Sequence, residues 1–207
     1  MKKFKKHTGI IAPLNIINID TDIIIPKQFL KSIKKTGFGK HLFHNWRYLD
    51  NQSKKINKNF ILNQKIYKNS SILITGRNFG CGSSREHAVW ALMDYGFKTI
   101  ISSKFSDIFY NNSINNNLLL IQLPEKKIQA IFLIIEKNKK TQCTINLLKN
   151  KIYIKKKKYK FSIEKFYKFK LIHGLDKIDL TLQKIQNIID YEKKNTPQYL
   201  ENRKLFS

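Results

Sequence analysis

The chain has 207 residues, of which 42% are hydrophobic and 26% charged, and its formal net charge is +26. A chain of this length and composition can bury one complete hydrophobic core, which argues against global disorder. No run approaches the roughly 18 apolar residues of a membrane-spanning helix, and no cleavage signal follows the basic N-terminus, so we expect a cytoplasmic protein with no membrane partner.

The excess charge comes almost entirely from lysine. Such a charge is typical of proteins that bind nucleic acids, which makes a basic nucleic-acid-binding protein the rival functional class. Arginine, which binds phosphate better through its planar fork, is scarce. Lysine also accompanies abundant asparagine and isoleucine, the residues of A/T-rich codons. Compositional bias explains the charge more simply, and we expect no nucleic-acid partner.

Cysteine is equally scarce, because Cys81 and Cys143 are the only two. Neither belongs to a CxxC motif or a Cys/His cluster, which argues against a disulfide scaffold and a Cys-rich zinc site. Two thiols also fall short of the usual ligand set of an iron–sulfur cluster. We therefore expect no metal site on this chain and a reducing environment.

The N-terminal half begins with β-branched residues over 10–25, interrupted by Pro13 and by the polar sequence DTD at 20–22. We expect one or two strands with a polar connection there. Residues 31–50 contain glycine and aromatic side chains without a clear period. They favour a functional loop or a short helix over a strand.

Strands and helices then alternate over residues 71–137, as in βαβ units. The expected elements are a strand at 71–75, a loop at 76–82, a helix at 84–95 ended by Gly96, a strand at 99–101, a helical turn at 105–110, a strand at 118–123, and a helix opened by Pro124. A β-meander over 144–154 and 159–161 and an amphipathic helix over 182–191 follow. We predict a single domain over 1–207 with a C-terminal helical extension.

The most informative stretch is NFGCGSSREH at residues 78–87. Ser83 and Glu86 have the spacing of a capping box, which is one interpretation of this stretch. A helix start also exposes free N–H groups and the positive end of the helix dipole, which favour anions. Arg85 adds donors whose geometry matches a carboxylate, and the same field would stabilise a serine oxyanion. The residues therefore predict an anion-binding helix N-terminus.

Three better-known motifs do not fit this stretch. A phosphate-binding loop requires Gly-Lys-Ser/Thr, which is absent, and the dinucleotide pattern GxGxxG stops after Gly80 and Gly82. The hydrolase motif GxSxG requires a glycine where Arg85 stands. Cys81, between two glycines, is interpreted as a small residue in limited space rather than as a nucleophile.

The same stretch carries a resemblance to a known family. Residues 78–88 are similar to the signature of the swivelling domain of the aconitase superfamily, and the chain more narrowly resembles the small subunits of bacterial 3-isopropylmalate dehydratases. The resemblance extends through further motifs in the same order, namely HTG at 7–9, DTDIIIPKQFL at 20–30, TGFG at 36–39, DIFY at 107–110 and GLD at 174–176.

The resemblance implies an α/β fold, a three-layer β/β/α swivelling domain of the aconitase type. It also implies a hydro-lyase of leucine biosynthesis, which isomerises 2-isopropylmalate to 3-isopropylmalate by dehydration and rehydration through 2-isopropylmaleate. In this family a separate large subunit holds a 4Fe-4S cluster. We therefore expect a heteromer with the large subunit and no cofactor on this chain. The closer alternative is a related hydro-lyase of the homoaconitase or citraconate type.

Site roles also follow from the resemblance. Ser83 would be the base that takes the proton from carbon, Arg85 would bind a substrate carboxylate, and Ser84 would assist through hydrogen bonding. Gly82, Asp22 and His87 are expected to support the site, although turn formation by Asp22 and an ordinary hydrogen bond of His87 stay open.

The loop at 31–39 corresponds in such relatives to the segment that faces the variable side chain of the substrate. Ile33 and Phe38 would then form an apolar pocket for an isopropyl group. Packing of both side chains inside this chain is the alternative.

Overall fold

The computed structural model describes residues 3–30, 35–50 and 52–195. The chain divides into two compact units, residues 1–174 and 175–207. The first unit holds the sheet and every residue of the predicted site that is described. Within residues 175–195, the described part of the second unit, there are two helices. A single domain over 1–207 with a helical extension stays a prediction.

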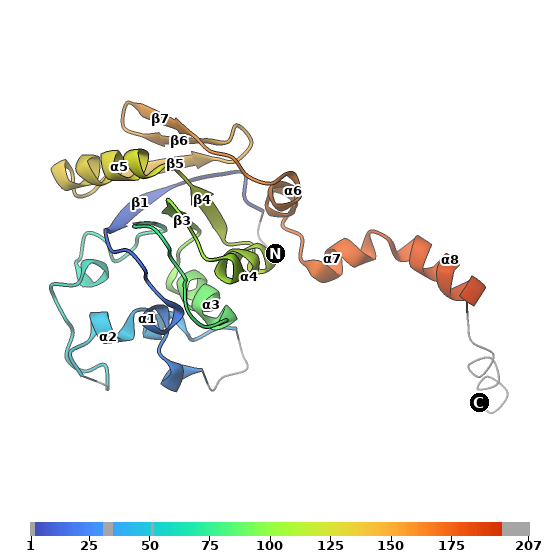
Figure 1. Ribbon diagram of the computed structural model, residues 1–207, viewed down its shortest axis with the longest axis horizontal. Helices are drawn as coiled ribbons and strands as arrows, with labels where there is room; N and C mark the ends of the chain where they lie inside the picture. Colours follow the sequence, from blue (N-terminus) through green and yellow to red (C-terminus); the bar gives the residue numbers. More distant parts are fainter. Residues whose placement is uncertain (1–2, 31–34, 51, 196–207) are drawn as a thin grey trace. The chain divides into compact units, whose positions relative to one another are not determined.

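A seven-stranded sheet forms the centre of the first unit (Figure 1), in the order β4-β3-β2-β1-β5-β6-β7. The strands are β1 (Lys6–Leu14), β2 (Ile72–Thr75), β3 (Thr99–Ser102), β4 (Leu119–Gln122), β5 (Gln142–Asn146), β6 (Lys151–Ile154) and β7 (Lys157–Lys160). The long strand β1 joins two halves, because residues 11–14 pair in parallel with β2 and residues 6–10 pair antiparallel with β5. The sheet is therefore parallel from β4 to β1 and a meander from β5 to β7.

Helices and short helical turns connect these strands. In the first unit they are α1 (Thr21–Ile24), α2 (His44–Arg47), α3 (Glu86–Tyr95), α4 (Asp107–Asn116), α5 (Glu125–Lys137), α6 (Lys165–His173) and the 3-10 turns η1 (Lys27–Phe29), η2 (Gly39–His41) and η3 (Ile61–Asn63). The second unit has α7 (Lys177–Leu182) and α8 (Ile185–Asn195). None of the helices among the described residues is both long and apolar enough to span a membrane.

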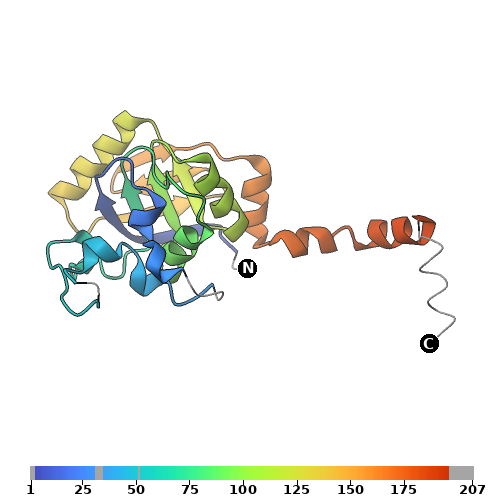
Figure 2. The same cartoon turned by 60° about the horizontal axis from the view of Figure 1, so that its bottom comes forward.

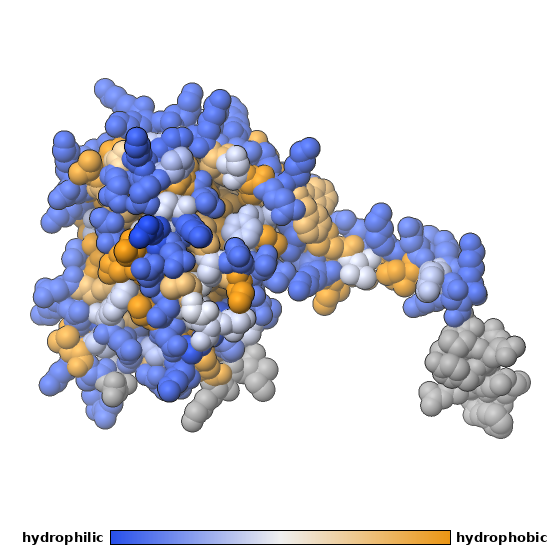
Figure 3. Space-filling model, in the orientation of Figure 1, coloured by the Kyte–Doolittle hydropathy of each residue, from blue (hydrophilic) through white to orange (hydrophobic). Residues whose placement is uncertain are grey.

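Alternation of side chains along the parallel strands produces two cores. Leu73 and Ile100 face one core, which α3 and α4 close, whereas Ile74 and Ile101 face the other, which α5 and the meander close. Figures 1 and 2 show α3 and α4 on one side of the parallel strands and α5 on the other. On the face of the first unit that Figure 3 shows, polar side chains predominate, with hydrophobic side chains between them. The mixed α/β fold with a curled sheet confirms the predicted fold class.

Most predicted elements between residues 71 and 161 are confirmed. The strands at 71–75, 99–101 and 118–123 and the meander are present within a residue or two, and Pro124 is the N-cap of α5. For residues 31–50 we expected a loop or a short helix in preference to a strand. The described residues 35–50 agree, because they form the short helices η2 and α2 and the loop segments around them.

Two expectations about secondary structure were wrong. Residues 21–24 form the short helix α1 instead of part of a strand, because the Oδ1 of Asp20 accepts a hydrogen bond from the N–H of Ile23 at 2.7 Å and caps α1. The turn at 105–110 is the full helix α4, since Phe109 and Ser113 are buried on its inner face. Helices α6 and α7 were not predicted.

Replacing Gly80 tests whether the backbone of the 78–87 stretch requires glycine at this position. Its φ is +77°, and an added Cβ would lie 2.3 Å from the ring of Phe109. Gly37 also has a positive φ, +92°, but nothing lies within 4 Å of its Cβ position. We expect Gly80→Ala to lower the free energy of unfolding by about 3 kcal/mol, because backbone strain adds to overpacking, and Gly37→Ala by about 1 kcal/mol. Urea denaturation measures both. Equal losses would contradict this account of Gly80.

Three histidines that are buried or partly buried should make the folded protein less stable in mild acid. Burial lowers the pKa of His7, His41 and His44, and the positive charges of Lys98 and Lys40 lower those of His7 and His41 further. Between these lowered pKa values and the ordinary histidine pKa of about 6.5, the unfolded chain binds more protons than the folded chain. The contribution of these histidines to the free energy of unfolding is therefore fully present above about pH 6.5, and it is lost as the pH decreases through that range.

Urea denaturation at about pH 7.5 and about pH 5.5 measures this effect, and His41→Gln should make the fall smaller by removing one titrating group. An unfolding free energy that stays constant over this range would contradict the prediction.

Candidate active site

Two segments far apart in the sequence lie side by side at the site. Strands β1 and β2 are parallel neighbours, so the segments that follow them, 16–25 and 76–85, leave the sheet at the same edge. Backbone hydrogen bonds join the two segments from Asn18 N–H to Arg77 O at 3.0 Å, from Gly80 N–H to Ile19 O at 2.7 Å, and from Thr21 N–H to Cys81 O at 2.9 Å. The predicted site is therefore built on two segments, not on one loop.

Ser83 is held by its backbone while its hydroxyl stays available. The buried Thr21 donates a hydrogen bond from Oγ1 to the carbonyl oxygen of Ser83 at 2.8 Å. The side chain of Ser83 is exposed, and its Oγ makes no hydrogen bond with any described residue. This geometry fixes the position of the serine without engaging its reactive oxygen.

The capping-box interpretation of Ser83 and Glu86 was wrong. Helix α3 starts two residues later than expected, with Arg85 as its N-cap, and no side chain caps it. The carboxylate of Glu86 accepts a hydrogen bond from Asn116 Nδ2 at 2.6 Å instead, and Asn116 Oδ1 accepts one from Trp90 Nε1 at 3.0 Å. The first N–H groups of α3 therefore have no side-chain acceptor and remain at the positive end of the helix dipole.

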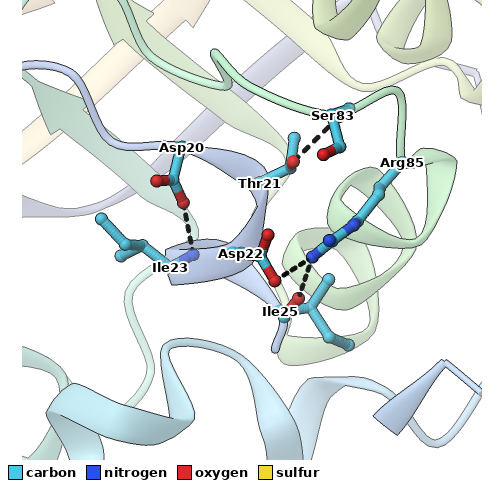
Figure 4. A network of polar contacts seen from close by, with 7 residues as sticks. All are labelled: Asp20, Thr21, Asp22, Ile23, Ile25, Ser83 and Arg85. Atoms are coloured by element: carbon cyan, nitrogen blue, oxygen red, sulfur yellow. Dashed lines mark hydrogen bonds and ion pairs between the residues drawn. The ribbon is translucent and has the colours of Figure 1, made fainter. Parts of the chain in front are cut away.

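Arg85 is the charged group of the site. Its Nη1 forms an ion pair with Asp22 in α1 and lies 3.5 Å from the carbonyl oxygen of Ile25. The Arg85 side chain is 15% exposed and that of Asp22 is 50% exposed, so Asp22 is the more solvent-exposed partner of the pair. Figure 4 shows Ser83 and Arg85 extending from the same loop toward α1.

The guanidinium of Arg85 keeps donors for a ligand. Its contacts with described residues use Nη1 alone, which leaves the N–H groups of Nε and Nη2 without a partner in the described part of the chain. A guanidinium fork that is held at one nitrogen can still bind a carboxylate through the others. The structure thus pairs Asp22 with Arg85, the supporting arrangement that the sequence left open.

Of the other predicted site residues, some lie next to Ser83 and others lie away from it. Gly82, with φ +84°, and Ser84 are exposed beside Ser83. His87, in the first turn of α3, packs edge-on against the ring of Phe38, with 5.2 Å between the ring centroids. Phe38 is only 2% exposed, so it packs inside this chain, and we do not include it in the proposed site. Ile33 lies outside the described residues.

Two residues of the site region escaped the sequence analysis. Thr21 lies inside the DTD motif, so the sequence pointed to the segment that holds Ser83, although not to Thr21 itself. No sequence motif pointed to Asp94. Its Oδ2 accepts hydrogen bonds from the N–H groups of Gly37 at 3.0 Å and Gly39 at 2.7 Å, and this attaches the loop after residue 34 to α3.

Cys81 does not have the environment of a nucleophile. Burial raises the pKa of its thiol, and the neighbouring Asp20 raises it further, so the thiol stays protonated near neutral pH. Within the described residues, no three His, Cys, Asp or Glu side chains come together as metal ligands would. The interpretation of Cys81 as a small residue in the turn agrees with this environment.

Ser83 and Ser84 are exposed to solvent in the part of the chain that the structure describes. Two cavities of about 750 and 660 Å³ are present, the first lined by residues such as Tyr110 and Phe161, the second by residues such as Trp90 and Phe97. Neither lining includes Ser83, Ser84 or Arg85. Electrostatic stabilisation of a charge is weaker at an exposed surface than in a site that excludes water.

Comparisons with known proteins identify the family. The model of the aconitase C-terminal domain matches residues 1–126. Proteins named 3-isopropylmalate dehydratase small subunit, from Buchnera aphidicola subsp. Diuraphis noxia and subsp. Pterocomma populeum, are each 59% identical to this chain. Both matches cover 100% of this chain, with 99% and 100% of the relatives. The chain belongs to the 3-isopropylmalate dehydratase small-subunit family. The aconitase-type resemblance predicted from the sequence is therefore confirmed.

A solved structure supports the same assignment. The crystal structure of a 3-isopropylmalate dehydratase from Methanocaldococcus jannaschii superposes with a TM-score of 0.63 at 27% sequence identity. The match covers 91% of this chain and 99% of that protein. The two proteins therefore share their fold over 91% of the present chain.

Thiol labelling tests the assignment of Cys81 as a structural residue. Burial raises the pKa of Cys143 to about 12, so iodoacetamide should leave it unmodified in the native protein. Cys81 should react more slowly than free cysteine near pH 8, since only the thiolate attacks, and Asp20→Asn should speed its reaction. Mass spectrometry follows both sites, with the denatured chain as the control. A Cys81 that reacts faster than free cysteine would contradict this assignment.

Proposed function

We propose that this chain is the small subunit of a 3-isopropylmalate dehydratase, a hydro-lyase that acts in the cytoplasm with a separate large subunit. It would isomerise 2-isopropylmalate to 3-isopropylmalate by removing and re-adding water through 2-isopropylmaleate. One observation carries the proposal. An unengaged serine hydroxyl and a carboxylate-binding arginine project from the same loop at the uncapped start of α3.

Ser83 serves as the base in this proposal. As an alkoxide it takes the proton from the carbon next to a substrate carboxylate, while hydroxide leaves the neighbouring carbon and the double bond of 2-isopropylmaleate forms. In the rehydration the same hydroxyl returns a proton to carbon. Ordinary serine does not ionise near neutral pH, and the uncapped N-terminus of α3 supplies the positive field that favours the alkoxide.

Arg85 positions the substrate in this proposal. The donors on Nε and Nη2 bind one substrate carboxylate, and the ion pair with Asp22 keeps the guanidinium in place when substrate is absent. Holding the carboxylate two residues from Ser83 brings the adjacent carbon within reach of the serine. This pre-orientation removes part of the entropic cost of the reaction.

The second half of the site belongs to the large subunit in this proposal. The described residues bring no set of metal ligands together, and the two cysteines lie on separate elements, the 76–85 loop and β5. We assign the 4Fe-4S cluster to the large subunit, where it would supply Lewis-acid chemistry toward the hydroxyl and a carboxylate of the substrate. Residues of the present chain bind the substrate, orient it and move the proton.

Substrate specificity stays the least constrained part of the proposal. A related diacid such as homoaconitate or citraconate offers the same carboxylate to Arg85 and the same proton to Ser83. The 31–39 loop would select among them, and residues 31–34 lie outside the described part. Turnover assays of the reconstituted heteromer with several 2-hydroxy diacids test this choice. Preference for a diacid without the isopropyl group would favour the related hydro-lyase.

Ser83→Ala tests the assigned base. We expect kcat of the heteromer, reconstituted anaerobically with the large subunit, to fall by about 10³-fold or more, since a positioned base contributes about 10²–10⁴-fold and no other group replaces it. The affinity for the large subunit should stay unchanged. Ser84→Ala, at the equally exposed neighbouring position, serves as the matched control and should lose far less. Near-normal turnover of Ser83→Ala would refute the assignment.

Arg85→Lys tests the carboxylate clamp. A lysine keeps the charge but loses the fork, so KM for 2-isopropylmalate should rise about 10- to 100-fold while kcat falls less than in Ser83→Ala. Arg77→Lys is the matched control, because Arg77 lies in the same loop with an exposed side chain. Steady-state kinetics of the heteromer distinguish the variants. An unchanged KM for Arg85→Lys would exclude its proposed role.

A further inference from the structure

A buried asparagine of α4 ties the carboxylate of Glu86 to that helix. Asn116 is the last residue of α4 and is only 4% exposed, and α4 packs beside α3 (Figures 1 and 2). Its Nδ2 donates a hydrogen bond to Oε1 of Glu86 at 2.6 Å, and its Oδ1 accepts one from Nε1 of Trp90 at 3.0 Å. One side chain of α4 therefore binds two residues of α3 that lie one turn apart.

The chemistry of these groups explains why an asparagine stands at this position. The indole N–H of Trp90 can only donate a hydrogen bond, and an ionised carboxylate can only accept one. A carboxamide offers both roles on one side chain, and Nδ2 of Asn116 donates as well to the carbonyl oxygen of Asn112 at 2.9 Å. The amide therefore has one favourable orientation, and an ionised aspartate at position 116 could not donate to Glu86.

Glu86 has a competing partner in the sequence. Ser83 and Glu86 have the spacing of a capping box, in which the serine oxygen accepts from the N–H of the glutamate and the carboxylate accepts from the N–H of the serine. This box would extend α3 to Ser83 as its N-cap, and it would engage the oxygen that the proposed function uses as a base. The box does not form in this structure, since the carboxylate bonds to Asn116 and α3 begins at Glu86.

We infer that Asn116 is a positioning residue, which keeps the capping box of Ser83 and Glu86 open by binding the carboxylate. The inference rests on the proposed function, because it gives Asn116 the task of keeping the Ser83 oxygen available for proton transfer. A carboxylate released from Asn116 would also lie at the positive end of the α3 dipole, where it would compete with a substrate carboxylate. Asn116 thus acts through Glu86 and not on the substrate itself.

Asn116→Ala tests this inference in two backgrounds. In the otherwise unchanged chain, kcat of the heteromer, reconstituted anaerobically with the large subunit, should fall by about 10-fold or more, because the released Glu86 closes the box on the base. In a Glu86→Ala chain the same substitution should change kcat by less than about 3-fold, since no carboxylate is left to release. The indole N–H of Trp90 loses its acceptor in both comparisons, so their difference isolates the coupling between Asn116 and Glu86.

Hydrogen exchange of the backbone amides gives a readout that needs no large subunit. In isolated Asn116→Ala the N–H of Glu86 should exchange about 10-fold more slowly than in the wild type, because Ser83 then accepts from it. A purely structural loss at α4 would leave this amide unchanged or faster. Asn115→Ala is the matched control, because Asn115 is the neighbouring asparagine of α4 and is only half-buried, and it should change neither kcat nor this exchange rate.

An unchanged kcat of Asn116→Ala, or an equal loss of kcat in both backgrounds, refutes the inference. Unchanged or faster exchange of the Glu86 amide refutes it as well. If Asn116→Ala does not fold, Asn116→Asp keeps the size of the side chain, loses the donor to the carboxylate and carries the same expectation for the Glu86 amide. A wild-type heteromer without activity on any of the diacids would overturn the proposed function instead, while slower exchange in the isolated variant would still support the contact between Asn116 and Glu86 as the one that keeps the box open.

Discussion

The contact between segments 16–25 and 76–85 is the constraint on which the site depends. A largely buried guanidinium is costly unless a carboxylate and further hydrogen bonds accompany it, and Asp22 and the carbonyl of Ile25 provide them. The same pair of segments holds Ser83 through Thr21. Both segments leave the carboxyl ends of adjacent parallel strands, so the fold delivers them to one place although about sixty residues separate them.

The start of α3 breaks a local rule for a purpose that the proposed function explains. The sequence offers a capping box, yet Ser83 leaves the helix uncapped and Glu86 bonds to Asn116 instead. An uncapped N-terminus gives up about 1 kcal/mol of helix stability. In return, the serine oxygen stays available and no side-chain oxygen caps the N–H groups at the positive end of the dipole, where Glu86 is the acidic residue of the first turn. Local rules that fail at one position are expected at functional sites.

The sequence predicted what depends on local pattern and missed what depends on distant partners. Strands β2, β3 and β4 are short apolar runs bounded by turn residues, so their positions follow from hydrophobicity alone. Helix α4 is rich in asparagine, and only the burial of Phe109 and Ser113 extends it beyond a turn. No local spacing encodes the contacts of Arg85 with Asp22 and of Thr21 with Ser83, which join residues about sixty positions apart. The family resemblance named Asp22 only as a supporting residue, with turn formation left open, and it did not single out Thr21.

The most direct test of this account is a crystal structure of the heteromer with 2-isopropylmaleate bound. The account predicts the Ser83 Oγ about 3–3.5 Å from the carbon that exchanges a proton, the Nε and Nη2 of Arg85 on a ligand carboxylate, and the ion pair with Asp22 intact. A Ser83 hydroxyl turned onto the N–H groups of α3, or a ligand bound away from Arg85, would contradict the assignment of base and clamp.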